Sequence, residues 1–274
     1  MISKFKDTAQ QILLRTQNQI YIEPSQALRE CVAHYTISFA NDNNVPDSLT
    51  LIPDASGCLV FTYDGFSLTS LLWGATTKTF TIKNDVNNCP MRLFIEFLPG
   101  GLFYLTGIKQ TDLTDLQIPV WQINARLHSL IADAFESAKN LSNFIDMLNL
   151  ILLSFMQKRN LPQVLFSAME NIRSHKGFLS VKELANMEFY SDRHLSRLFN
   201  DYLGMSVKTF SNIVRINHVL KIINEGHHLP VDFAQTPGFY DQAHFIHTFK
   251  AICGVTPKKY LDKMSEFYNE PFKL

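Results

Sequence analysis

Two different spacing patterns of hydrophobic residues divide the chain into an N-terminal and a C-terminal part. From about residue 20 to 120, short runs of β-branched and aromatic residues are separated by Gly, Pro, Asn and Asp, which is typical of strands. Several short strands at this spacing predict a β-sandwich or a small barrel. The clearest runs are 57–65, 68–76, 78–84 and 91–101, and the last ends in a predicted tight turn at Pro99, Gly100 and Gly101.

From residue 127 the apolar positions follow a helical period instead. Between 127 and 135 they recur at i, i+3, i+4, i+7 and i+8, and a second apolar helix is predicted from about 141 to 158. The first stripe fits a dimer seam as well as a face packed on the sheet of its own domain, because amphipathicity does not name the partner. The polar segment 157–162 ends in Pro and predicts a domain boundary.

The remainder of the chain contains one motif twice. Segments 189–210 and 239–260 match at an offset of 50 residues, and each predicts a helix that begins at an N-cap and ends at a glycine. A capping box at 180–183 begins the preceding helix of the first copy, so two helices joined by a short turn form a helix-turn-helix. For the second copy a short helix is predicted at Phe233-Ala234 and a turn at Pro237-Gly238. The matched pairs are Ser191 and Asp241, Leu195 and Phe245, Phe199 and Phe249, and Gly204 and Gly254.

One continuous helix is predicted between the copies, from Ser206 to about Glu225. About 20 residues at a rise of about 1.5 Å span about 30 Å, which is close to the ~34 Å repeat of B-DNA. A rod of this length could place two recognition helices in successive major grooves. Two helices at a fixed spacing read twice as many base pairs as one.

Composition and charge add little support for nucleic acid. The 274 residues are 46% hydrophobic and 18% charged with a net charge of zero, so the chain is globular and not strongly basic. Residues 1–161 carry 12 Lys and Arg against 14 Asp and Glu, and residues 162–274 carry 13 against 11. Neither a signal peptide nor an 18-residue apolar span is apparent, so we expect a cytoplasmic protein without a membrane segment. The four scattered cysteines predict reduced thiols rather than disulfides or zinc ligands.

The stretch from about 165 to 268 resembles the DNA-binding domain of the AraC/XylS family of transcription regulators. The resemblance implies a multi-domain α+β protein: a β-rich sensing or dimerisation domain with C-terminal helices at 1–160, and an all-α domain of two helix-turn-helix units joined by a linker helix at 161–274. The N-terminal part is similar to the family's sensor half, most clearly at 97–101. The residues that carry the main resemblance are Leu184-Ala185, Ser191, Gly238 to Gln242, Phe245, Phe249-Lys250, Gly254 to Pro257 and Tyr260.

The resemblance also assigns DNA contacts residue by residue. Many relatives have Arg where this chain has His247, and a neutral His lacks the bidentate fork that Arg offers guanine. We therefore expect the first unit to carry more of the sequence discrimination. The residues expected to face bases are Arg193, Ser196, Arg197, Ala243, His244 and His247. Those expected near phosphates are His194, Gln242, Lys208, Lys221, Lys250, Lys258 and Lys259.

The implied function is sequence-specific regulation of transcription. The expected partners are double-stranded promoter DNA, RNA polymerase, a small-molecule effector at the N-terminal domain and a second copy of the chain. The resemblance suggests an activator, although the residues themselves fit activation and repression equally. No cofactor is expected. His244 and His247 have a spacing that a metal site could use, but no third ligand lies nearby in sequence. The aromatic residues that could line an effector pocket are Phe61, Tyr63, Trp73, Phe94 and Phe97.

Two other interpretations stay open. The chain could be a ligand- or protein-binding module whose helix-turn-helix units no longer bind DNA. It could also be an enzyme built on the β-domain, but we expect none, because no GxSxG, HExxH, P-loop or GxGxxG motif occurs. Some DNA-repair methyltransferases carry a similar helical domain, yet they need a reactive cysteine in a recognisable frame. Cys31, Cys58 and Cys89 are isolated.

Overall fold

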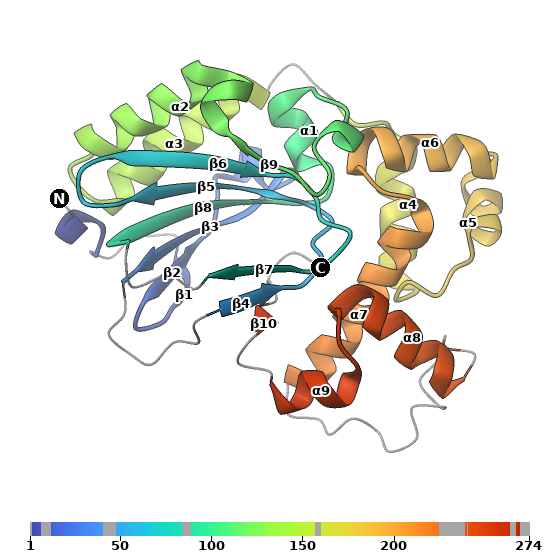
Figure 1. The fold of residues 1–274 in the computed structure, drawn as a ribbon. Coiled ribbons are helices and arrows are strands. Elements are labelled where there is room, and N and C mark those ends of the chain that lie inside the picture. Colours follow the sequence, from blue (N-terminus) through green and yellow to red (C-terminus); the bar gives the residue numbers. More distant parts are fainter. Residues whose placement is uncertain are drawn as a thin grey trace.

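The computed structural model describes residues 2–6, 12–40, 48–83, 89–156, 160–224, 239, 241–263 and 267–268. In Figure 1 helices cover one face of a large sheet, a small sheet lies beneath it, and a helical part stands beside both. The predicted multi-domain α+β architecture is confirmed, with a β-rich part before a helical part.

The larger sheet joins strands from across the N-terminal half, all antiparallel to their neighbours. Its order is β1 (Ile12–Arg15), β2 (Gln19–Ile22), β3 (Val32–Phe39), β8 (Met91–Phe97), β5 (Cys58–Tyr63), β6 (Leu68–Trp73) and β9 (Gln117–Pro119). The smaller sheet has the order β10 (Phe267–Tyr268), β4 (Ser48–Leu51) and β7 (Phe80–Lys83), and β10 runs parallel to β4. Each of the four predicted runs contains one strand, namely β5, β6, β7 and β8.

Short helices complete the N-terminal half. They are η1 (Ile2–Phe5), η2 (Gln26–Leu28), α1 (Gly101–Thr106) and η4 (Gln110–Asp112). The predicted turn at 99–101 leads directly into α1, and Gly100 has the left-handed φ of 85°. A Cβ at Gly100 would lie 2.5 Å from Cδ1 of Leu161, so a larger residue would also displace that leucine side chain.

Two helices cover the apolar face of the larger sheet. They are α2 (Val120–Ser137) and α3 (Leu141–Met156), and the residues of the predicted stripe lie on α2. Leu127, Ile131 and Phe135 are each at most 2% exposed and belong to the same core as Leu59 and Ile95 of the sheet. The stripe therefore packs on its own domain, and the dimer-seam interpretation is wrong for these residues.

The C-terminal half contributes six described helices besides β10. They are α4 (Gln163–Ser174), α5 (Val181–Glu188), α6 (Asp192–Leu203), α7 (Val207–Asn224), α8 (Gln242–Cys253) and α9 (Pro257–Asp262). The predicted capping box is present, because Ser180 accepts from the backbone of Glu183 and the Glu183 side chain accepts from the backbone of Ser180. The predicted elements at Phe233-Ala234 and Pro237-Gly238 lie outside the described residues.

The predicted linker helix is confirmed as α7. It is continuous over 18 residues, which at about 1.5 Å per residue is about 27 Å. Phe210, Ile213, Ile216 and Leu220 are fully buried and place this helix at the centre of the second core. Three residues of the N-terminal half also join that core, so the two halves pack against each other. These three are Ile52, Ala55 and Ala75.

Candidate nucleic-acid interface

Helix α6 is fixed at both ends and along one face. The Ser191 hydroxyl accepts from the backbone N–H of His194 at 3.2 Å, and Gly204 ends the helix with a φ of 74°. Leu195 and Phe199 are fully buried. Because the caps fix the ends and the buried residues fix the rotation, the polar face of α6 is presented to solvent.

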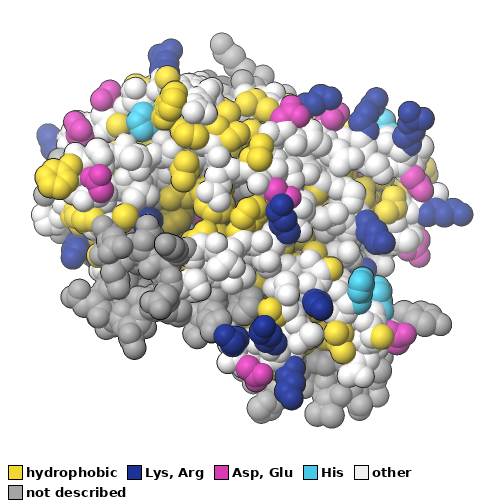
Figure 2. Space-filling view, viewed as in Figure 1, with side chains coloured by type: hydrophobic (Ala, Val, Ile, Leu, Met, Phe, Trp, Pro, Cys, Tyr) yellow, Lys and Arg dark blue, Asp and Glu magenta, His cyan; other side chains and the backbone are white. Residues whose placement is uncertain are grey.

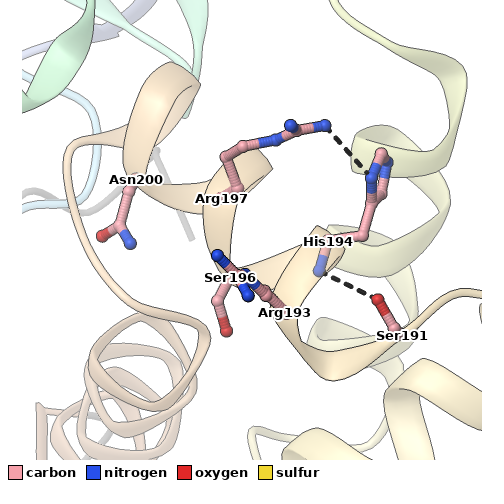
Figure 3. A pocket seen from close by; sticks show the side chains of 6 residues that line it. All are labelled: Ser191, Arg193, His194, Ser196, Arg197 and Asn200. Atoms are coloured by element: carbon pink, nitrogen blue, oxygen red, sulfur yellow. Dashed lines mark hydrogen bonds between the residues drawn. The ribbon is translucent and has the colours of Figure 1, made fainter.

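Four polar side chains share that face at i, i+3, i+4 and i+7. They are Arg193, Ser196, Arg197 and Asn200, which line one hollow together with Ser191 and His194 (Figure 3). Both arginines are exposed, and Ser196 and Asn200 are half-buried. The structure thus brings together the three base-facing residues predicted on this helix.

Asn200 is absent from the sequence prediction but belongs to the same face. An asparagine amide can form a bidentate pair with adenine. Its position, one turn after Ser196 and Arg197, was a usable signal, because residues three and four apart on a helix are neighbours.

His194 links Arg197 to an aromatic ring. Nη2 of Arg197 lies 3.3 Å from Nδ1 of His194, and the Tyr190 ring stacks on the imidazole with centroids 4.7 Å apart and planes 14° apart. Since a guanidinium only donates, Nδ1 is the acceptor in this contact. Figure 3 shows the arginine side chain bent toward the histidine.

Helix α8 repeats this construction in the second unit. The Asp241 carboxylate accepts from the backbone N–H of His244 at 2.7 Å, and Gly254 ends the helix with a φ of 75°. Phe245 and Phe249 are fully buried. The predicted contact residues of this helix are all exposed, namely Gln242, Ala243, His244, His247 and Lys250.

Arg215 of α7 connects the two units. Its guanidinium lies 5.1 Å from the ring centroid of Phe178 and 5.3 Å from that of Phe239, and it donates to the carbonyl of Gly177 at 2.6 Å. Phe239 in turn packs edge-on against Phe245 of α8 with centroids 5.0 Å apart. Burial lowers the pKa of Arg215 from its usual value. Cation–π contacts are strongest when desolvated, so this half-buried contact holds Phe239 to the segment before α5.

Positive side chains lie around both recognition helices. In Figure 2 Lys and Arg are densest along the side that carries α5 and α6 and again around α9. The predicted phosphate-contacting lysines are all exposed, namely Lys208, Lys221, Lys250, Lys258 and Lys259. Asp and Glu side chains lie among them in the same view, in keeping with the small excess of 13 basic over 11 acidic residues in 162–274.

The predicted effector-pocket residues do not come together. In the strand register Phe61, Tyr63 and Phe97 point to the face that the helices cover, where each is at most 8% exposed. Phe94 and Trp73 point to the opposite face. A cavity of about 70 Å³ does lie on the helix-covered side, between the sheet and α1, α2 and α3. It is smaller than the ~150 Å³ that accommodates benzene.

Other kinds of site find no support in the described ranges. They contain no group of three His, Cys, Asp or Glu side chains that could hold a metal ion. In the same part of the chain, no helix combines the length and apolarity needed to cross a bilayer. Burial raises the pKa of the Cys31 thiol to about 11 and that of Cys253 further, so the nucleophilic thiolate is disfavoured at both.

Comparison with known proteins identifies two regions. Residues 184–263 match the model of a helix-turn-helix domain, and residues 21–119 match a domain of unknown function (DUF6597). A probable transcription factor, PqrA of Proteus vulgaris, is 30% identical over 82 residues, which cover 30% of this chain and 67% of that protein. The chain belongs to the AraC/XylS family.

Other relatives match over a stretch of the same length. An uncharacterised helix-turn-helix-type regulator of Staphylococcus aureus is 37% identical over 82 residues, 30% of this chain and 11% of that protein. The chain thus spans about a tenth of the length of the Staphylococcus relatives that it matches. Among solved structures, ToxT of Vibrio cholerae aligns with a TM-score of 0.40 and 11% identity, covering 89% of this chain and 96% of that one. A score this low supports no inference about ligands.

Proposed function

We propose that this AraC/XylS-family protein is a sequence-specific DNA-binding regulator of transcription. The observation that carries the proposal is the pair of capped helices, α6 and α8, with their predicted base-facing side chains in solvent and one unbroken helix between them. Each helix would enter the major groove, and the two would read successive segments of promoter DNA. The protein would act in the cytoplasm as an activator together with RNA polymerase.

The two recognition helices would contribute unequally. Helix α6 presents two exposed guanidinium groups, Arg193 and Arg197, whereas α8 presents His244 and His247. A bidentate arginine–guanine contact discriminates by about 1–3 kcal/mol, and a neutral imidazole has no such fork. Most of the sequence selectivity would therefore lie in the half-site that α6 reads.

The N-terminal domain would modulate DNA contact through the end of α6. The Thr114 hydroxyl donates to the Gly204 carbonyl at 2.8 Å, and Nζ of Lys109 lies 3.2 Å from Oδ1 of Asp201. Lys109 and Thr114, which flank η4, thus contact the end of the recognition helix, and Phe103 of α1 packs edge-on against Tyr202 with centroids 4.7 Å apart. An effector or partner that shifted these segments would move α6 directly. We place the boundary between the sensing and DNA-binding domains at 160 and 161, between α3 and α4.

The second unit touches the N-terminal domain at the equivalent position. A Cβ on Gly254, which matches Gly204 in the repeat, would lie 3.0 Å from the Thr79 hydroxyl oxygen. Both recognition helices are therefore contacted at their C-terminal glycines by the same domain. A change in that domain could alter the orientation of both helices, which would couple effector binding to DNA affinity.

Selection of bound duplexes from random DNA by the full chain tests the proposal. The expected product is a site with two conserved segments about one helical turn, or about 10–10.5 base pairs, apart. An Arg193→Ala, Arg197→Ala double variant serves as the matched control, and it should enrich sites that lack the better conserved segment. Recovery of no consensus by the wild-type chain at low salt would contradict the proposed function and would favour a module that does not bind DNA.

A further inference from the structure

Two aromatic side chains before α6 do not belong to the core. Phe189 is 95% exposed and Tyr190 is 45% exposed, although both directly precede the N-cap Ser191. Phe239, which matches Phe189 in the repeat, is only 7% exposed and packs against Phe245. Phe189 is therefore not a core residue as its counterpart Phe239 is.

Tyr190 contacts a residue of the recognition surface instead. Its ring lies nearly parallel to the imidazole of His194 at a centroid distance of 4.7 Å. This contact fixes the plane of the imidazole, because rotation about the Cβ–Cγ bond would break the stack. The Ser191 cap fixes the backbone of His194 at the same place.

The fixed imidazole then directs Arg197. Its Nδ1 faces Nη2 of Arg197 at 3.3 Å, one turn further along the helix, and Figure 3 shows the guanidinium extended toward it. Arg193 is exposed on the neighbouring part of the same face and, within the described residues, makes no hydrogen bond or ion pair. Of the two arginines on α6, only Arg197 is thus held in place before DNA binds.

We propose that Tyr190 and His194 are positioning residues that hold the guanidinium of Arg197 for base recognition. The inference rests on the proposed function and assigns His194 a role other than the phosphate contact that the family resemblance implies. An unrestrained arginine loses side-chain freedom when it binds a base, whereas a pre-oriented one has lost part of it already. The resulting gain in DNA affinity should therefore appear only at the base pair that Arg197 reads.

The second unit lacks the equivalent arginine. His244 and His247 occupy the positions of His194 and Arg197, so no guanidinium stands where the imidazole could direct it. The imidazole of His244 meets the ring of Phe239, the counterpart of Phe189, edge-on at 5.8 Å and 62°, and Tyr240, the counterpart of Tyr190, lies outside the described residues. The arrangement is therefore a property of α6, and its loss should leave the half-site of α8 unaffected.

The test uses the full chain and the duplex recovered by site selection, with a panel of single-base-pair substitutions. Binding is measured by fluorescence anisotropy for wild type, Y190A, Y190F, H194A and R197A at two salt concentrations. R197A should lose discrimination at one base pair, by about 5- to 150-fold. Y190A and H194A should lose about three- to tenfold of the discrimination at that same pair. Y190F should behave as wild type, because stacking does not need the hydroxyl.

Two readouts separate positioning from other roles. The salt slope should be unchanged in Y190A and H194A, whereas loss of a phosphate contact would lower it. The Y190A, R197A double variant should bind no worse than R197A alone, because both changes act through one contact. A thermal melt of each variant controls for folding, and H194A provides the second test if Y190A is unstable.

Several outcomes would overturn the inference. One is that Y190A keeps full discrimination at the base pair of Arg197, and another is that it weakens binding equally at every sequence. The inference also fails if R197A shows no position-specific loss. If wild type itself shows no sequence preference, the proposed function fails first. Wild type could discriminate and R197A lose discrimination at one base pair, while Y190A and H194A behave as wild type. That result would refute only the positioning role.

Discussion

The contact between the N-terminal domain and α6 predicts that two equivalent glycines respond differently to one substitution. Gly204 and Gly254 occupy the same position in the repeat and have φ values of 74° and 75°. An alanine at either position therefore carries the same cost for a left-handed backbone, about 1–2 kcal/mol. Any further difference between G204A and G254A must come from what each new Cβ meets.

The surroundings of the two Cβ positions differ sharply. At Gly204 the new atom would lie 2.0 Å from the Thr114 hydroxyl oxygen and 2.8 Å from the Gln110 carbonyl oxygen. Relief of this overlap breaks the hydrogen bond from Thr114 to Gly204, worth about 1 kcal/mol, and shifts η4, at about 1–3 kcal/mol for an overpacked contact. At Gly254 the nearest atom is the Thr79 hydroxyl oxygen at 3.0 Å, which a small movement relieves.

Urea unfolding of the full chain measures the difference. G254A should lower the free energy of unfolding by about 1–2 kcal/mol, and G204A by about 2–4 kcal/mol more than that when the clash and the lost hydrogen bond are added. The double variant G204A, T114A removes the clashing hydroxyl and should recover part of the loss. Equal midpoints for G204A and G254A would show that η4 does not pack on the end of α6 in solution.

Three further predictions concern DNA contact, capping and pH. Lys250→Ala should weaken cognate and scrambled DNA alike and lower the salt slope by about one, and a loss confined to cognate DNA would contradict a phosphate contact. Ser191→Ala should lower the unfolding free energy by about 1 kcal/mol, with Ser191→Asp as the matched control that keeps the cap, so equal loss in both variants would argue against capping. Burial raises the pKa of the Cys31 thiol to about 11, so the unfolded thiol ionises first and stability should fall as pH rises from about 9 toward 11. Denaturant titrations of Cys31→Ala should show a shallower fall of the unfolding free energy over this pH range than wild type shows. An unchanged dependence on pH would refute the raised pKa of Cys31.

Local chemistry made the helical half predictable from the sequence. Ser180, Ser191, Gly204 and Gly254 act on backbone groups within a few residues, so the helix ends that they predict do not depend on tertiary structure. The linker helix α7 follows in the same way from its apolar period. The 50-residue repeat then fixed the equivalence of the two units without any knowledge of their packing.

Long-range pairing explains what the sequence did not reveal. Nothing local indicates that Phe267 and Tyr268 pair with Thr50 and Leu51, or that Thr114 meets the end of α6, because these contacts join distant segments. The effector-pocket residues are divided between two faces of the sheet for a simpler reason. Residues at odd separation on a strand point to opposite faces, so residues 94 and 97 of β8 could not have lined one pocket.

The central claim is that two helices at a fixed spacing read successive major grooves on one side of a duplex. Methylation interference at guanine N7 tests it most directly, because N7 lies in the major groove. On the selected duplex the account predicts two groups of interfering guanines about 10–10.5 base pairs apart, with R197A abolishing interference in only one of them. A single group, or two groups half a turn apart on opposite sides of the duplex, would contradict the account.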